Sequence, residues 1–135
     1  MDLMDSIAVS ASGMAAQSTR MKVASENIAN VDSLVTPEGG PYRRQIITFE
    51  TVLNRNTGLN EVKVRSVKDD MQTPLNYEYS PNHELADANG YVAKPNVSTM
   101  IEKMDVKDAS RAYEANMAAI ESAKEMMVRS IDLLQ

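Results

Sequence analysis

The sequence predicts an α+β protein in which long N- and C-terminal helices pack as an α-helical coiled coil, with a small irregular antiparallel β portion between them. Apolar residues recur every seven positions near both ends of the chain, and such a repeat keeps one seam of a helix against a partner. All five prolines and four of the five glycines lie between about residues 31 and 98, whereas nine of the ten methionines lie outside that stretch. Helix-breaking residues are therefore confined to the middle. These shifts divide the chain into an N-terminal helix (1–30), a loop and small β portion (31–98) and a C-terminal helix (99–135).

The first helix is expected to run from about residue 3 to about residue 29. Asp2 is placed to act as its N-cap, and Asp5 lies near the positive end of the helix dipole. Asn30 is the expected stop, because asparagine tolerates the left-handed conformation that often ends a helix. At 1.5 Å per residue the helix would be roughly 40 Å long. Its seven-residue series consists of Ile7, Met14, Met21 and Ile28.

The last helix is expected to begin near Thr99, where Thr99 and Glu102 have the spacing of a capping box, and to run to the chain end. Bulky and small residues alternate along its stripe, and alanines on its flanks leave room for more than one neighbouring helix. The two stripes could simply close a helical hairpin within one chain. The length of the helices relative to the β portion favours additional packing against other subunits. The seven-residue series here consists of Val106, Tyr113, Ile120, Met127 and Leu134.

The middle of the chain is expected to form three or four short strands. Residues 46–52 are rich in strand-forming types, and residues 62–67 and 75–79 alternate between apolar and polar side chains. Turns are expected near residues 56–58, 80–82 and 88–90. This portion contains few large apolar groups, so it would be marginally stable alone and would gain by packing on the helices or on neighbours.

Composition excludes several classes of function. The net charge is −5 and no basic stripe is present, so a nucleic-acid partner is not expected. The chain lacks cysteine, which excludes disulfides and thiolate metal sites. The N-terminus has no signal-peptide pattern, and no window is apolar enough to span a bilayer, so direct membrane insertion is not expected. Composition alone would therefore favour a cytoplasmic protein.

No catalytic, cofactor-binding or metal-binding constellation is found in the sequence. The single histidine, His83, lies in a polar loop and is expected to be exposed. Asp69 and Asp70 are followed by no further oxygen ligands at calcium-loop spacing, so a solvated turn is expected there. Nucleotide-binding, hydrolase and metalloprotease motifs are missing. We therefore expect no enzyme and no cofactor.

The helical seams are instead the candidate functional surface, as interfaces between subunits. Asparagines interrupt or terminate the apolar stripes, and a buried asparagine with satisfied hydrogen bonds can fix the register of packed helices. We expect subunit-interface roles for Ile7, Met14, Met21, Asn27, Ile28, Asn30, Val106, Tyr113, Asn116, Ile120, Met127 and Leu134.

Four stretches, in order along the whole chain, resemble the flagellar rod and hook axial family. The first and last resemble the family in general, and the second and third, with the short length, resemble the members that build the proximal rod. Glu26 departs from the pattern, since the family usually has a small residue there. The four stretches are Ser-Glu-Asn-Ile-Ala-Asn at 25–30, Pro-Glu-Gly-Gly-Pro-Tyr-Arg-Arg at 37–44, the segments 87–92 and 95–97, and Arg-Ala-Tyr-Glu-Ala-Asn at 111–116.

The resemblance implies a structural subunit of the bacterial flagellar basal body that leaves the cytoplasm through the flagellar type III export apparatus without a cleaved signal. It implies assembly with copies of itself and other rod proteins, and contact with ring and export-apparatus proteins at the rod base. The rod would transmit torque and enclose the export channel, and the terminal helices would commonly be disordered before assembly. Alternatives are another rod subunit, a cytosolic coiled-coil adaptor or export chaperone, and a peptidoglycan-cutting enzyme, for which no catalytic carboxylates are found.

Overall fold

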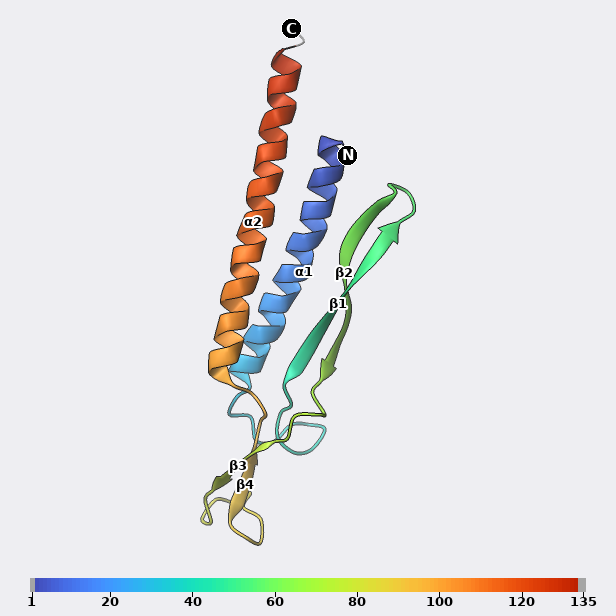
Figure 1. Cartoon of the computed structure of the whole chain (residues 1–135). Helices are drawn as coiled ribbons and strands as arrows, with labels where there is room; N and C mark the ends of the chain where they lie inside the picture. The colour runs from blue at the N-terminus through green and yellow to red at the C-terminus, as the bar shows by residue number, and fades with distance from the viewer. Residues whose placement is uncertain (1, 134–135) are drawn as a thin grey trace.

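The computed structural model describes residues 2–133 and confirms the α+β class. Two long antiparallel helices, α1 (Leu3–Ala29) and α2 (Thr99–Asp132), lie side by side, and a strand hairpin lies along α1 (Figure 1). A smaller hairpin projects beyond the end of the helices at which α1 ends and α2 begins (Figure 1). No described helix combines the length and the apolar character needed to cross a membrane.

The helix α1 begins and ends where the sequence predicts, but Asn30 stops it by a different mechanism. At the start, the backbone N–H of Asp2 donates to the Asp5 carboxylate over 2.8 Å. Asn30 has φ −104°, so the prediction of a left-handed residue was wrong. Its side-chain Nδ2 instead donates to the Glu26 carbonyl over 2.8 Å. The same carbonyl accepts the Asn30 backbone N–H over 3.1 Å, so the side chain adds a second donor to the last turn and fixes Asn30 at the helix end.

The helix α2 also begins where predicted, but the predicted capping box is wrong. Ser98 is the N-cap residue and makes no side-chain capping bond. Glu102 is turned into the protein and is only 1% exposed, because the buried Asn27 on α1 and Arg44 at the entry to β1 bind its carboxylate. At its other end α2 projects past the start of α1, so its last described turns have no α1 beside them (Figure 1).

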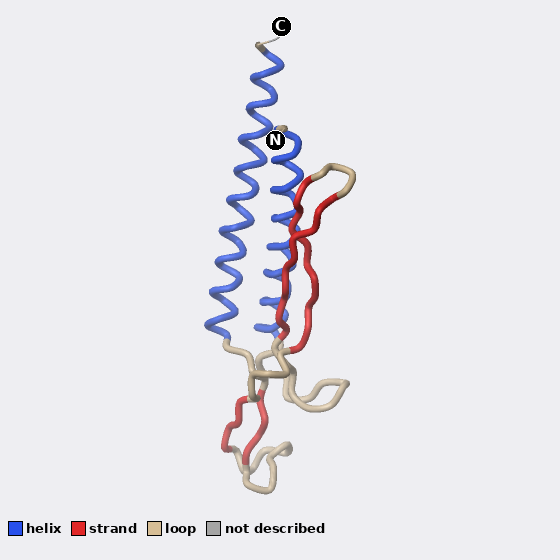
Figure 2. Tube along the Cα trace, turned by 45° about the vertical axis from the view of Figure 1, so that its right-hand side comes forward, coloured by secondary structure: helices blue, strands red, loops and turns tan. Residues whose placement is uncertain are grey.

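The middle of the chain forms four strands in two separate antiparallel hairpins; the sequence predicts three or four strands but not how they pair. In the longer one, β1 (Gln45–Asn54) pairs with β2 (Leu59–Asp69), with a register shift between Thr48 and Phe49. The Val62 N–H donates to the Ser12 hydroxyl over 3.1 Å, which joins this hairpin to α1. In the shorter one, β3 (Asn76–Tyr79) pairs with β4 (Tyr91–Lys94). Figure 2 shows the long hairpin beside the helices and the short one beyond them.

The core is thin, as the composition predicts, and small residues dominate it. The buried apolar residues are Ala16, Val23, Ala24, Val92, Val97, Ala109 and Ala123. Most large apolar side chains of α2 are instead exposed to solvent. They are Met100, Ile101, Met104, Met117, Met126, Val128 and Ile131.

Candidate functional site: a polar junction

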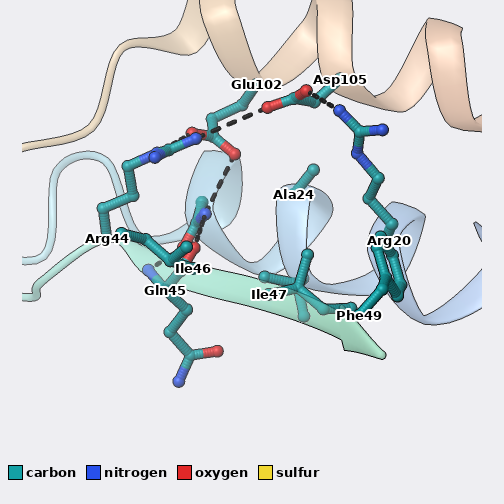
Figure 3. Close-up of a pocket in the computed structure, with 11 residues that line it drawn as sticks. Arg20, Ala24, Arg44, Gln45, Ile46, Ile47, Phe49, Glu102 and Asp105 are labelled. Atoms are coloured by element: carbon teal, nitrogen blue, oxygen red, sulfur yellow. Dashed lines mark hydrogen bonds and ion pairs between the residues drawn. The ribbon is translucent and has the colours of Figure 1, made fainter. Parts of the chain in front are cut away.

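The last turns of α1, the first turns of α2 and the start of β1 surround a cleft of about 340 Å³. Figure 3 shows Glu102 and Asp105 reaching from α2 toward two arginines, Arg44 at the entry to β1 and Arg20 on α1. This polar junction, which we define as Arg20, Asn27, Tyr42, Arg44, Glu102 and Asp105, connects all three parts of the fold.

Asn27 is the centre of the junction, and its amide uses its full hydrogen-bonding capacity. The residue is 1% exposed. Its Nδ2 donates to the Gln45 carbonyl and to Glu102 Oε2, both over 3.0 Å. Its Oδ1 accepts from the Gln45 N–H over 2.8 Å and from the Tyr42 hydroxyl over 2.9 Å. Asn27 therefore fixes the end of α1 to both β1 and α2, and a buried amide that lost these partners would cost about 1–3 kcal/mol.

Charged groups of alternating sign extend the junction along the helix pair. Glu102 Oε1 accepts from Arg44 Nε over 2.5 Å, while Glu102 Oε2 is bound to Asn27. Asp105 pairs with Arg20 over 2.5 Å and with Arg44 over 3.5 Å. Two arginines thus balance two carboxylates, and the buried Glu102 in particular requires such a partner. These contacts connect α1, α2 and the start of β1, and they place no nucleophile beside a base.

Tyr42 contributes a hydroxyl that stays protonated at neutral pH. Burial, assisted by the nearby negative charge of Glu26, raises the pKa of the Tyr42 hydroxyl above its usual value. The phenol therefore remains a donor to Asn27 Oδ1 throughout the physiological range.

A second polar cluster lies behind the junction and corrects the prediction for Asp70. Asp70 is 6% exposed, not solvated, because Oδ1 accepts the N–H groups of Gln72 and Thr73, each over 3.0 Å. Asn96 donates to the Asp70 and Thr73 carbonyls and accepts the Arg44 N–H over 2.8 Å. The Arg44 backbone therefore links this cluster to the junction.

Asp70→Asn is expected to remove an acid-sensitive contribution to the stability of the β portion. The Thr73 hydroxyl and backbone N–H hold the pKa of the Asp70 carboxyl below its ordinary value. A depressed folded-state pKa means that the stabilisation is present above pH about 4 and is lost as the pH falls through the lowered folded value. Comparing urea unfolding of the two proteins at pH 7 and near pH 2 checks this. A destabilisation by Asp70→Asn that is equal at both pH values would contradict it.

The described residues contain no group of three or more histidine, cysteine or acidic side chains arranged to hold a metal ion. His83 is exposed, as predicted, and its Nδ1 accepts the Leu85 N–H over 3.1 Å. That contact is local to one loop and lies apart from the polar junction.

The predicted seam residues lie at the inner or half-covered positions of the two helices. Asn27 is buried, and the other described members of the set are half-buried; Leu134 lies outside the described residues. Asn116 faces α1 at Gly13, where an added Cβ would lie 2.9 Å from Asn116 Nδ2. Gly13 therefore allows a close approach of the helices at this point. The role of the seam residues as subunit interfaces stays a prediction.

Sequence reasoning found Asn27 but missed its partners. Glu102 was assigned to a cap, and no role was predicted for Arg20, which pairs with Asp105 beside it. Arg44 lies at the end of the family-like stretch 37–44, and this position was the one signal in the sequence that pointed to a functional role for it. The distinguishing property, burial among complementary charges, comes from residues as far apart as 27 and 102 and is invisible to local patterns.

Comparison with known proteins agrees with this architecture. Residues 7–34 match the family model described as flagella basal body rod protein, and residues 88–133 match the one described as flagellar basal body rod FlgEFG protein C-terminal. The chain is 39% identical to a protein of Salmonella typhimurium over the full length of both chains. It is 40% identical to one of Borreliella burgdorferi, covering 100% of this chain and 99% of that one. It is also 40% identical to one of Agrobacterium fabrum, covering 94% and 91%.

All three relatives are named flagellar basal-body rod protein FlgC. The matches span nearly the whole of both chains, including the helices, both hairpins and the polar junction. The chain therefore belongs to the FlgC family of flagellar basal-body rod proteins.

Proposed function

We propose that this chain is a structural subunit of the proximal rod, part of the drive shaft of the bacterial flagellum. The observation that carries the proposal, beyond family membership, is the set of large apolar side chains that a single chain leaves uncovered on several sides of α2. Burying a large apolar side chain contributes about 1.5–3 kcal/mol, so covering three of them would contribute roughly 5–9 kcal/mol per subunit. Assembly supplies that cover, because each α2 would meet helices of neighbouring subunits.

In this proposal each of the three segments of the chain has a separate role. Residues 1–30 and 99–135 are axial helices that pack as a coiled coil within and between subunits, and the predicted seam residues line those contacts. Residues 31–98 lie outside the helical tube and determine which neighbours fit. The small residues between α1 and α2, with Gly13 beside Asn116, support this close helical packing.

The polar junction would transmit torque between the axial helices and the β portion. Torque applies a sideways load to the connection between these parts. Paired charges and hydrogen bonds have a fixed geometry and resist such sliding, whereas contacts between apolar surfaces resist it less. Asn27 and Glu102 bind each other and β1 at fixed geometry, so the parts move together. No catalysis is involved.

The proposed location is the rod within the cell envelope, reached through the flagellar type III export apparatus without a cleaved signal peptide. The proposed partners are further copies of this chain, other rod proteins, and the ring and export-apparatus proteins at the rod base. The enclosed lumen would pass later export substrates.

The test is complementation in a flagellated bacterium that lacks its own proximal-rod subunit of this family. The full chain, carrying an epitope tag, should restore swimming, and gold-labelled antibody should mark the rod of purified basal bodies near the membrane ring. An empty vector is the control. A tagged chain that stays in the cytoplasm, or restores swimming without entering the rod, would refute the proposal.

Asn116→Leu is expected to give a subunit that still associates but builds irregular rods. Asn116 interrupts an apolar stripe where α2 meets Gly13, and its amide specifies one register by its size and polarity. Leucine would strengthen nonspecific packing while crowding Gly13. Electron microscopy of basal bodies from mutant and parent provides the comparison. Rods of uniform length and shape from the mutant would show that Asn116 does not set the register.

A further inference from the structure

Three tyrosines form an exposed face on the short β3–β4 hairpin. The strand register places Tyr77 opposite Ala93 and Tyr79 opposite Tyr91, so all three rings lie on one side. Tyr77 and Tyr79 are each 64% exposed and Tyr91 is 43% exposed. Val92, on the other side of the hairpin, is only 2% exposed. One side is therefore packed on the protein and the other, which we term the tyrosine face, is open to solvent.

The tyrosine face is held in a fixed conformation before any partner binds. Tyr79 and Tyr91 meet edge to face, with ring centres 5.3 Å apart. Gly90, at φ +83°, lies under this pair, where an added Cβ would be 3.0 Å from the Tyr79 ring and 3.1 Å from Pro81. Preorganised tyrosines lose little conformational freedom on binding and are common in the energetic centres of protein interfaces.

A second surface of unusual composition lies on the outer side of α2. Its members recur at helical spacing on the side opposite the buried Ala109, and every one of them is exposed. We term this surface the methionine–basic stripe. It consists of Met100, Lys103, Met104, Lys107 and Arg111.

The two surfaces are complementary in charge. The segment 76–94 carries Glu78, Glu84 and Asp87 against the single Lys94, a net charge of −2 with His83 neutral. The stripe carries three cations, and two exposed carboxylates, Asp108 at its border and Glu114 one turn beyond Arg111, leave a net +1. The other two carboxylates of these turns, Glu102 and Asp105, are held by the arginines of the polar junction.

The two surfaces are also complementary in chemistry. Methionine sulfur and arginine or lysine cations make favourable contacts with tyrosine rings. Opposite net charges would orient the approach and disfavour tyrosine-to-tyrosine pairing.

Within one chain the tyrosine face and the stripe do not meet. The short hairpin projects beyond the start of α2 and away from it, whereas the stripe runs back along the helix (Figures 1 and 2). Two different surfaces that fit each other only between copies make a head-to-tail contact, which generates a ring where the rotation closes and a helical assembly where it does not. A neighbour displaced along the long axis would place its stripe beside the hairpin.

We propose that the tyrosine face of one subunit docks on the methionine–basic stripe of a second copy of this chain. The proposal rests on the proposed function, since it requires the chain to assemble with itself. It assigns the short hairpin as the element that connects neighbouring subunits outside the helical seams.

Disulfide trapping tests the contact directly, because the chain has no cysteine of its own. Two full-length alleles with tags of different size, Tyr77→Cys and Lys107→Cys, are expressed together in the complementation strain. Oxidised basal bodies should contain a disulfide-linked dimer that carries one tag of each kind. The matched control replaces Lys107→Cys with Ser122→Cys, an exposed position further along α2, and should yield at least tenfold less mixed dimer.

The outcomes separate this contact from the proposed function. If basal bodies contain both cysteine variants but no mixed dimer, or if position 77 is linked to a different protein, the contact is refuted and the rod function stands. If even the unaltered chain is absent from basal bodies, the proposed function fails and the contact fails with it.

Charge reversal provides a second, independent readout. Lys107→Glu combined with Arg111→Glu should reduce the swimming fraction at least tenfold, while the helix content stays unchanged because lysine, arginine and glutamate have similar helix propensities. Adding Glu84→Lys on the exposed hairpin loop should restore at least half of that loss. A triple variant no better than the double one would argue against the charge pairing.

Discussion

Ile120→Asp is expected to abolish motility by blocking rod assembly. Ile120 is half-buried in the middle of the α2 seam, four residues beyond Asn116, which faces Gly13 of α1. In the assembled rod, where the seam is expected to be covered, aspartate at this site would place an unpaired carboxylate at a helix contact, at a cost of several kcal/mol in every subunit. Electron microscopy of purified basal bodies is the measurement, with swimming in soft agar as the functional readout.

The control for this prediction is Ser122→Asp, which adds the same charge two residues away at an exposed position. It should leave rods and swimming intact, as should His83→Ala in an exposed loop. Normal rods from Ile120→Asp would refute the seam assignment, and loss of rods in Ser122→Asp as well would show that the effect is not specific to the seam.

The helices were predictable from sequence because their signals are local. Proline and glycine are largely confined to the middle, and a seven-residue apolar repeat lies at each end. These features determine where helices can form, whichever elements pack against them. The predicted ends near residues 3, 29 and 99 match α1 and the start of α2. The strands followed from alternation and turn residues for the same reason.

The errors arose where one residue had two competing uses. Glu102 has the spacing of a capping residue, but an arginine and a buried amide offer a stronger pairing than one backbone N–H. The sequence predicts Asp70 in a solvated turn. In the structure its carboxylate accepts hydrogen bonds from Thr73 and Gln72, and these bonds stabilise the turn. Local spacing identifies both residues as hydrogen-bonding groups, and only the fold determines the partner.

The polar junction was not predictable as a unit because its members come from three distant segments. Asn27, Arg44 and Glu102 are brought together by the antiparallel helices and the entry into β1. A thin core of alanine and valine cannot by itself specify the angle between a helix pair and a hairpin, since small apolar contacts are tolerant of rotation. Directional bonds at the junction supply that specification.

Arg44→Met is expected to weaken the rod severely, because it leaves Glu102 buried without its cation. The Glu102 side chain is 2% exposed and that of Arg44 is 26% exposed. Breaking a buried ion pair by removing one partner costs about 3–5 kcal/mol, whereas replacing both partners with apolar residues is often close to neutral. The urea concentration at which purified basal bodies lose their rods should therefore fall sharply for Arg44→Met and for Glu102→Met, and less for the double variant.

The double variant separates stability from mechanical coupling. Two methionines would fill the cleft between the helices and β1, but they would make no directional bond to Asn27 or Asp105. Rods of the double variant should therefore survive urea better than those of either single variant and yet swim poorly under viscous load. Arg129→Met, which breaks an exposed pair with Glu125 near the end of α2, is the matched control and should change neither property. Strictly additive effects of the two junction substitutions would show that Arg44 and Glu102 act separately, and full swimming by the double variant under load would show that packing alone transmits torque.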